Sequence, residues 1–296
     1  MGTRGSALAR WQAQHVRARL AEAGADCEIV VVTTSGDRHG ETALAQIGGK
    51  GLFTKELEEG LRAGDLDFAV HSLKDVPAQL PPGLVLGAVP ERADVRDALV
   101  AAPGATLLSL PPGARLGTGS VRRRAQVLGL RHDLILLPLR GNVDTRLRRW
   151  REGDFDALLL AGAGLDRLGR AEVIAERLDP EQFLPAAAQG ALALECRAGD
   201  ARVLQALAPL HHAPTARAVA AERALLRRLE CGCQAPVAAW AREAEGKLRL
   251  DALVASPDGS RRLRHAADGS PGQPEALGEQ VAEALLRAGA AAILRQ

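Results

Sequence analysis

A pattern of apolar strand, glycine-bearing turn and basic helix start occurs three times in the middle third of the chain. The three stretches are residues 114–128, 134–150 and 156–169. Strands that alternate with helices at this spacing predict α/β domains, in which helices flank a sheet. At each turn the unpaired N–H groups of a helix start face the ligand side of such a sheet and attract anions. The pattern therefore predicts anion-binding turns on an α/β scaffold.

The segments before this region continue the α/β pattern. Residues 6–23 carry apolar side chains near helical spacing and predict an amphipathic helix, and residues 27–34 predict a β-branched strand. Residues 35–51 form a glycine-rich polar stretch without periodicity, which predicts a long functional loop. Residues 67–70 predict a short buried strand that runs into a polar sequence. A hinge zone between two lobes is indicated by proline-bearing stretches at residues 81–83, 90–97 and 111–113.

The last third of the chain predicts a smaller α+β domain. After a strand at residues 191–197, the sequence predicts a helix that begins near residue 211 and runs through Leu229. Residues 236–241 and 247–264 predict strands, and the Asp-Gly pair within the second stretch is typical of a hairpin turn. A closing helix is expected over residues 274–288. Two lobes and this domain together make an α/β protein.

Composition limits the compartments and partners that suit the chain. It has 296 residues, a net charge of +2 and no apolar run of about 20 residues. We therefore expect no membrane span and no global attraction to nucleic acid. The first residues lack the apolar core of a signal peptide, from which we expect a reducing, cytoplasmic location with free thiols. Of 38 cationic residues only four are lysines, and three of these lie within residues 50–74, which suggests a task for a compact ammonium group.

Basic residues gather at the turns of the repeated pattern. Arg122 and Arg123 follow the first turn and Arg140 precedes the second helix, where backbone N–H groups already attract anions. Thr118 and Ser120 add hydroxyl donors beside them, and guanidinium groups bind carboxylates or phosphates with two hydrogen bonds. A solvated, charge-rich helix face is the alternative for any single arginine. Together these residues predict a cleft for a multiply anionic ligand.

Two kinds of anionic ligand fit this sequence poorly. Proteins that bind single-stranded nucleic acid usually add aromatic stacking platforms, whereas this chain has four Phe, three Trp and no Tyr. A nucleotide would need a phosphate loop, but the Gly-Lys pair within residues 45–53 is followed by Gly51 instead of the Ser or Thr that binds magnesium. We therefore expect neither nucleic acid nor a nucleotide as the ligand.

One carboxylate lies where α/β proteins tend to bind ligands. Asp75 follows Lys74 just after the buried strand at residues 67–70. A surface ion pair or an ordinary turn residue is the simpler interpretation of this spacing. The functional interpretation is a carboxylate that a nearby cation keeps ionised and that faces a positive charge in the ligand.

Cys231 and Cys233 flank a single glycine, and this pair allows several chemistries. Zinc would need further ligands, but His211 and His212 lie at a spacing that fits no common zinc pattern, so we expect no metal. A disulfide between the two cysteines would need a strained small ring and an oxidising setting. A nucleophilic or modified thiol and a small residue in a turn both remain open.

Eight stretches in a fixed order add to this interpretation. They are TRGSALA (3–9), IGGKGLFTKELE (47–58), DFAVHSLKDVP (67–77), LGTGSVRRRAQ (116–126), LRGNVDTRL (139–147), AGLDRLG (163–169), LPAAAQGALALECR (184–197) and LECGCQAPV (229–237). In this combination they closely resemble the hydroxymethylbilane synthase family of tetrapyrrole biosynthesis, whose members are also called porphobilinogen deaminases. The resemblance runs from residue 3 almost to the end of the chain.

The resemblance implies a fold and a reaction. Two lobes similar to periplasmic binding proteins flank a cleft, and a smaller C-terminal α+β domain carries the cofactor. The implied bounds are 1–91 and 190–209 for lobe one, 95–185 for lobe two and 213–296 for the C-terminal domain. Four porphobilinogen molecules add to a covalent dipyrromethane primer with loss of ammonia, and hydrolysis releases hydroxymethylbilane. The resemblance also implies a cytoplasmic monomer without nucleic-acid or membrane partners.

The family's functional residues are expected where this sequence matches its motifs. Cys233 is the expected attachment residue for dipyrromethane, and Asp75 the expected catalytic carboxylate. Cofactor contacts are expected from Ser72, Lys74, Thr118, Ser120, Arg122, Arg123 and Arg146. Contacts with substrate or the growing chain are expected from Arg4, Ser6, Lys50, Phe53, Arg140, Arg146, Arg167 and Gln189. Lys50 and Phe53 belong to the family's mobile loop and its hinge.

The sequence departs from the family's pattern at a few positions. Gly119 stands where a serine is common, so one donor to the cofactor is expected to be missing. Cys231 stands where a glycine is often found, and Ala7 where proline is common. The family's first strand is usually longer, so we expect either a shortened strand or a start codon further upstream.

Overall fold

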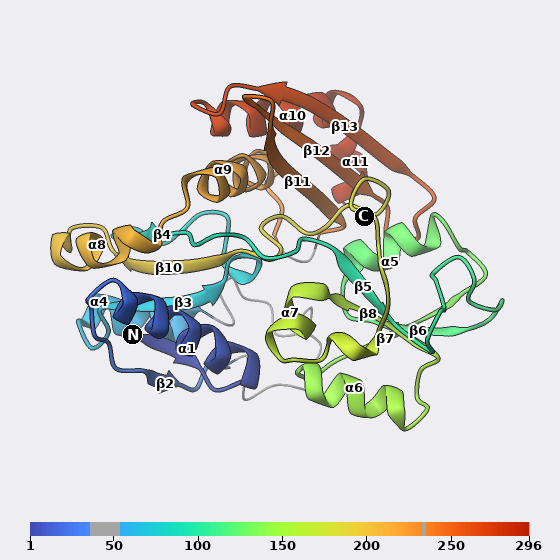
Figure 1. Cartoon of the computed structure of the whole chain (residues 1–296). Helices are drawn as coiled ribbons and strands as arrows, with labels where there is room; N and C mark the ends of the chain where they lie inside the picture. The colour runs from blue at the N-terminus through green and yellow to red at the C-terminus, as the bar shows by residue number, and fades with distance from the viewer. Residues whose placement is uncertain (36–53, 233–234, 296) are drawn as a thin grey trace. The chain divides into compact units, whose positions relative to one another are not determined.

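The computed structural model describes residues 1–35, 54–232 and 235–295. These residues form two compact units (Figure 1). Unit 1 comprises Met1–Ala93 and Gly190–Ala216, and unit 2 comprises Asp94–Gln189 and Arg217–Gln296. The chain therefore passes between the units three times, at residues 93–94, within the predicted hinge stretch 90–97, at residues 189–190 and at residues 216–217.

Unit 1 is built on a mixed five-stranded sheet. Its order is β2-β1-β3-β10-β4, in which β1 pairs in parallel with β2 and β3, while β10 runs antiparallel to β3 and β4. Leucines of α4 pack on one face of the sheet and apolar residues of α1 on the other. The elements are β1 (Gly2–Arg4), α1 (Ala7–Glu22), β2 (Val30–Val32), α4 (Lys55–Ala63), β3 (Phe68–Ser72), the 3₁₀ turn η1 (Leu73–Asp75), β4 (Leu84–Ala88), β10 (Leu192–Arg197), α8 (Ala201–Leu207) and η3 (Ala208–Leu210).

Unit 2 contains a second mixed sheet of the same design. Its order is β7-β6-β8-β5-β9, in which β6 pairs in parallel with β7 and β8, while β5 runs antiparallel to β8 and β9. The reversed strand β5 is the first strand after the chain enters unit 2, and the reversed strand β10 is the first after it returns to unit 1. The elements are β5 (Asp97–Val100), β6 (Arg115–Thr118), α5 (Val121–Leu128), β7 (Ile135–Pro138), α6 (Val143–Arg151), β8 (Ala157–Ala161), α7 (Gly162–Arg167), η2 (Ala171–Val173) and β9 (Ile174–Arg177).

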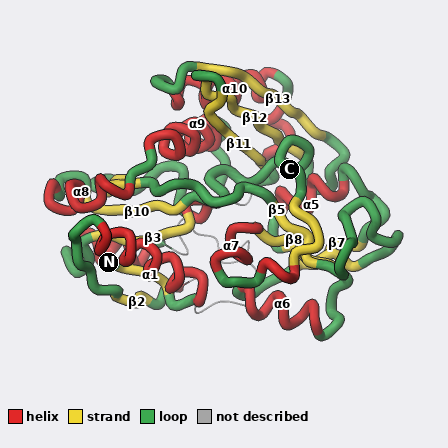
Figure 2. The backbone as a smooth tube through the Cα atoms, in the orientation of Figure 1, coloured by secondary structure: helices red, strands yellow, loops and turns green. Residues whose placement is uncertain are grey.

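The rest of unit 2 is a three-stranded antiparallel sheet with helices packed against it (Figure 2). The turn at Asp258–Gly259 joins two of its strands, and Gly259 has a φ of +73°, which favours glycine. Apolar residues of three helices form its core with the sheet. The elements are α9 (Ala213–Arg228, whose first residues belong to unit 1), β11 (Val237–Ala244), β12 (Lys247–Ala255), β13 (Arg262–Gly269), α10 (Pro274–Arg287) and α11 (Ala290–Leu294).

The structure confirms the predicted fold class and most predicted elements. Each of the three repeated stretches forms a strand and a helix, and the Asp-Gly hairpin is present. The predicted turn separates strand and helix in the first two stretches, whereas in the third α7 begins directly after β8. Several strands differ in extent, among them β11, which continues beyond the predicted residues 236–241 to Ala244. The strand predicted over 27–34 is limited to Val30–Val32, and β3 continues to Ser72 because His71 and Ser72 still pair with β10. Nearly all of the predicted loop 35–51 lies outside the described residues.

Candidate functional site

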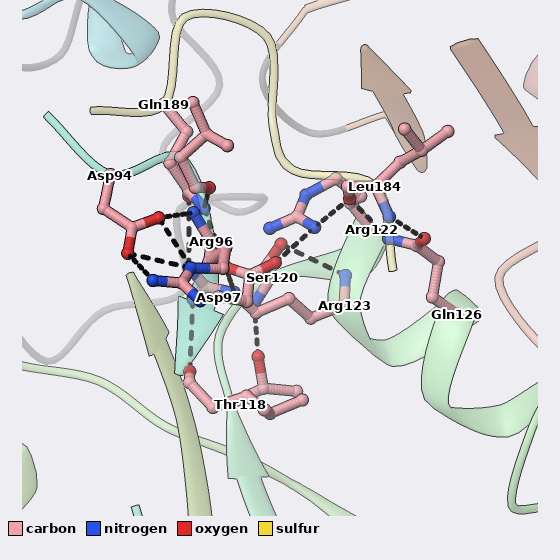
Figure 3. A network of polar contacts seen from close by, with 12 residues as sticks. Asp94, Arg96, Asp97, Thr118, Ser120, Arg122, Arg123, Gln126, Leu184 and Gln189 are labelled. Atoms are coloured by element: carbon pink, nitrogen blue, oxygen red, sulfur yellow. Dashed lines mark hydrogen bonds and ion pairs between the residues drawn. The ribbon is translucent and has the colours of Figure 1, made fainter. Parts of the chain in front are cut away.

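The most strongly buried charged cluster of unit 2 lies where β5 begins and α5 begins (Figure 3). Asp97, the first residue of β5, is fully buried and joins Arg122 and Arg123 from the first turn of α5. One carboxylate oxygen accepts a hydrogen bond from Arg122 Nη1 at 2.7 Å, and the other accepts from Arg123 Nε at 2.8 Å. The two arginines, expected to bind a ligand, therefore share one internal carboxylate.

Neighbouring backbone and amide groups complete this cluster. Arg122 Nη1 also donates to the carbonyl oxygen of Leu184 at 2.7 Å, and Arg123 Nη1 donates to that of Leu159 at 3.2 Å. Gln189 is buried, and its Nε2 donates to Asp97 Oδ1 at 2.9 Å while its Oε1 accepts from Arg123 Nη2 at 3.4 Å. The structure thus brings three predicted site residues, Arg122, Arg123 and Gln189, into one network.

The charges of the cluster depend on one another. Burial alone would raise the pKa of Asp97, but the two guanidinium groups and the hydrogen bond from Gln189 outweigh burial and hold this pKa well below its usual range. Burial lowers the pKa of Arg122, and Asp97 opposes that shift. With both arginines charged, the three ionised groups carry a net positive charge, which favours one further anion.

The turn between β6 and α5 presents two hydroxyl groups beside the arginines. Ser120 is the N-cap of α5, and its Oγ accepts from the backbone N–H of Arg123 at 3.4 Å. Thr118 Oγ1 accepts from the backbone N–H of Ser120 at 3.2 Å. A Cβ at Gly119 would lie 2.5 Å from the carbonyl oxygen of Leu139, so this turn is packed too closely for the serine that is common in the family.

Other predicted cationic residues of unit 2 are less buried. Arg140 is half-buried and makes no hydrogen bond or ion pair within the described residues. Arg146 Nε donates to the carbonyl oxygen of Gly141 at 2.8 Å. Burial lowers the pKa of the half-buried Arg167. Further along α6, Arg148 and Arg149 instead form ion pairs with Glu152 and Asp154, each at 2.8 Å, which agrees with the alternative of a solvated helix face.

In unit 1, three predicted residues follow one another at the end of β3. Ser72 Oγ accepts from Gln12 Nε2 of α1 at 2.8 Å, which ties the strand end to the helix. Lys74 is half-buried within the turn η1. The carboxylate of Asp75 is exposed and has no hydrogen bond or ion pair with another described residue. An exposed carboxylate at a strand end is available to a ligand.

The remaining predicted residues of unit 1 lie around the start of α1. Arg4 ends β1 and is half-buried, and Ser6 is the N-cap of α1, with its Oγ accepting from the backbone N–H of Ala9 at 3.2 Å. Cys233, Lys50 and Phe53 lie outside the described residues. Cys231 is described and half-buried. Across residues 1–35, 54–232 and 235–295, no group of three or more His, Cys, Asp or Glu side chains could hold a metal ion.

Sequence reasoning missed Asp97 and Gln12. Asp97 opens an otherwise apolar strand, and a charge at the first position of a buried strand was the available signal. Gln12 lies among apolar residues on the buried face of α1, where an amide side chain needs a partner.

The helices of the described chain include none that is long and apolar enough to span a bilayer.

Comparison with known families covers almost the whole chain. Residues 1–205 match the family model described as "Porphobilinogen deaminase, dipyromethane cofactor binding domain", and residues 216–287 match "Porphobilinogen deaminase, C-terminal domain". The porphobilinogen deaminase of Syntrophotalea carbinolica is 52% identical over 99% of this chain and 94% of its own length. That of Thiobacillus denitrificans is 49% identical over 99% of this chain and 97% of its own length.

The solved structures that the chain resembles are more distant in sequence. A putative methionine-binding lipoprotein from Bacillus subtilis is 13% identical to this chain and has a TM-score of 0.42. The match covers 71% of this chain and 90% of the lipoprotein chain. The BvgS VFT2 domain of Bordetella pertussis is 18% identical to this chain and has a TM-score of 0.40. The match covers 68% of this chain and 76% of the VFT2 chain. The two family matches and the relatives near 50% identity place the chain plainly: it belongs to the porphobilinogen deaminase family.

Proposed function

We propose that the chain is a hydroxymethylbilane synthase. It joins four porphobilinogen molecules head to tail on a covalent dipyrromethane primer and then releases hydroxymethylbilane by hydrolysis. At each addition the aminomethyl carbon of the incoming ring forms a bond to the free ring carbon of the preceding one. Ammonia leaves from the aminomethyl carbon, and a proton leaves from the ring carbon that is attacked. Family membership over nearly the whole chain supports this function.

The observation that carries the proposal is the pair of arginines at the start of α5. Porphobilinogen bears an acetate and a propionate side chain, so a chain of such rings presents many carboxylates. Arg122 and Arg123 share only one internal carboxylate, that of Asp97, and lie where helix N–H groups add a positive potential. These residues therefore favour a carboxylate of the ligand.

The donors beside this pair also fit dipyrromethane. The Nε of Arg122 is buried and has no hydrogen-bond acceptor among the described residues. The hydroxyl groups of Thr118 and Ser120 accept bonds from the backbone, and their own protons stay available within the described part of the chain. We assign Thr118, Ser120, Arg122 and Arg123 to the cofactor's acetate and propionate groups. When bound, the cofactor supplies the ring carbon to which the first substrate is joined.

Asp75 is assigned the catalytic role. Loss of ammonia and attack on the remaining carbon leave a positive charge on a pyrrole ring. An ionised carboxylate that accepts hydrogen bonds from pyrrole N–H groups stabilises this charge and accepts or returns a proton at its oxygen. Its exposure at the end of β3 supports this assignment. The roles of Ser72, Lys74, Arg4, Ser6, Arg140, Arg146, Arg167, Gln189, Lys50 and Phe53 toward cofactor and substrate stay predictions.

Intact-mass spectrometry tests the function without measuring turnover. Protein purified from cells that make porphobilinogen should carry a covalent dipyrromethane adduct. The adduct should vanish in Cys233→Ser and persist in the matched variant Cys231→Ser. An unmodified mass in the wild type would instead favour a non-catalytic anion-binding protein.

The cytoplasmic location, the monomeric state and the three-domain division also belong to the proposal. Light scattering of the purified protein tests whether it is a monomer.

A further inference from the structure

Glu222 is a buried carboxylate that has no part in the proposed reaction. It lies on α9 and is fully buried. Its Oε2 accepts a hydrogen bond from the backbone N–H of Ala188 at 2.5 Å, and its Oε1 accepts from the backbone N–H of Ala241 in β11 at 2.7 Å. Through these two bonds the side chain joins the segment around Ala188 to the C-terminal sheet.

The segment that Glu222 holds has an unusual backbone. Ala188 has a φ of +60°, in the left-handed region that costs an L-residue free energy. The same segment is also held to β11 by the hydrogen bond from Ala239 N–H to the carbonyl oxygen of Pro185 at 3.1 Å. A non-glycine residue keeps such a conformation only where its surroundings enforce it, and the bond to Glu222 is made at this residue.

The residue that follows Ala188 belongs to the arginine cluster. Gln189 donates from Nε2 to Asp97 Oδ1 at 2.9 Å and to the carbonyl oxygen of Val95 at 2.8 Å. Its Oε1 accepts from Arg123 Nη2. The conformation at Ala188 sets the direction in which this side chain leaves the backbone. A change at Ala188 therefore moves an amide that contacts both Asp97 and Arg123.

We propose that Glu222 is a positioning residue for the arginine cluster. By holding Ala188 in its left-handed conformation, it directs Gln189 toward Asp97 and Arg123 and so fixes the orientation of the guanidinium groups. It acts through the backbone N–H of Ala188, which donates to its Oε2. The proposal rests on the proposed function for its kinetic test, but its structural test is independent of activity.

Two substitutions separate positioning from simple packing. Glu222→Gln keeps the shape of the side chain but puts an NH₂ group against one of the two backbone N–H donors, so one bond is lost. Ala188→Gly removes the side chain that disfavours a positive φ. In the double variant the glycine adopts the native conformation without help from Glu222. Glu243→Gln, at a glutamate ion-paired with Arg217 in the same unit, is the matched control.

The measurements are amide hydrogen exchange of residues 185–191 and kcat/KM with porphobilinogen. Glu222→Gln should speed exchange in this segment and lower kcat/KM by about 10–100-fold, as a displaced binding group does. In the double variant, Ala188→Gly should recover at least half of the lost kcat/KM on a logarithmic scale. The single variant Ala188→Gly should change kcat/KM by less than about 3-fold. Glu243→Gln should leave both measurements unchanged.

Two results would overturn the proposal. One is a Glu222→Gln protein with wild-type exchange and kcat/KM. The other is a double variant no better than Glu222→Gln, which makes Glu222 a packing residue only. If Glu222→Gln does not fold, Glu222→Asp, which keeps the charge on a shorter side chain, takes its place in the same comparison. If the wild type shows no turnover, the proposed function fails, while the exchange data of residues 185–191 still decide the role of Glu222.

Discussion

The two mixed sheets share one strand order, yet they differ in how a buried carboxylate is compensated by neighbouring groups. In each sheet a reversed strand carries a fully buried carboxylate, Glu195 on β10 in unit 1 and Asp97 on β5 in unit 2. Asp97 is held by two arginines and a glutamine. Glu195 has His71 Nε2 at 3.0 Å, without the alignment of a hydrogen bond, and its Oε1 has no partner in the described residues.

Position along the strand explains the difference. Asp97 is the first residue of β5 and pairs with Ala161 at the end of β8, so residues from the start of α5 reach it. Glu195 lies inside β10, opposite Ala69 of β3, and its ion-pairing neighbour among the described residues is His71, also of β3. In this fold, charge that a ligand can use therefore gathers at the end of a strand, where helix starts and turns meet.

The largest expected effect concerns the exposed acid of unit 1. Asp75→Ala should lower turnover by about 10²- to 10⁴-fold, because the developing positive charge loses its carboxylate. It should leave the free energy of unfolding within about 0.5 kcal/mol, because the side chain is exposed, and intact mass should still show the cofactor. Asp65→Ala, at another exposed aspartate of unit 1, is the control and should keep its turnover. Near-normal turnover of Asp75→Ala would remove the catalytic assignment.

Asp97, the buried acid of unit 2, should affect the free energy of unfolding. Asp97→Asn leaves two buried guanidinium groups without their shared carboxylate, and breaking a buried ion pair in this way costs about 3–5 kcal/mol. Urea unfolding measures the loss. Glu152→Gln, which breaks an exposed pair with Arg148, should cost less than about 1 kcal/mol. Equal stabilities of the two variants would mean that Asp97 does not compensate the arginines.

The pH dependence gives the same pair a second test. The pKa of Asp97 lies below its unfolded value of about 3.9. Its stabilising effect is therefore fully present above that pH and is lost as the pH falls through the lower folded value. The difference in unfolding midpoint between wild type and Asp97→Asn should stay constant from pH 7 to 5 and shrink below about pH 4. A difference that already shrinks between pH 7 and 5 would contradict the ion-pair interpretation.

The sequence predicted local structure well and long-range partners poorly. The turn before α5 and the hairpin at Asp258–Gly259 follow from residues adjacent in the chain, and both are present. The partner of Arg122 and Arg123 is not local, because Asp97 reaches them only when β5 pairs between β8 and β9. The shared strand order of the two sheets was missed for the same reason. In unit 1 the reversed strand β10 follows the other four strands and is separated from them by the whole segment 94–189, whereas in unit 2 the reversed strand β5 precedes the other four, so no sequence repeat marks the shared order.

The helix starts of the two units offer a smaller comparison. Ser6 caps α1 and Ser120 caps α5, although the residues that follow are apolar in one helix and basic in the other. Replacing either serine by alanine should cost about 1 kcal/mol of unfolding free energy, and replacing it by threonine much less. Chemical denaturation measures both. If Ser120→Ala lowers cofactor loading without any loss of stability, its hydroxyl is a ligand donor and not a cap.

The smallest effect is expected at Glu195, the buried acid of unit 1. Glu195→Gln and Asp97→Asn are the same chemical change, carboxylate to amide, on the reversed strands of two equivalent sheets. At Glu195 the charge is buried with incomplete compensation, so its removal relieves a desolvation cost. The new amide can still donate to His71 Nε2 when that nitrogen is unprotonated. We expect the unfolding free energy to change by less than about 1 kcal/mol, in either direction. A loss as large as that of Asp97→Asn would show that His71 compensates Glu195 as fully as the arginines compensate Asp97.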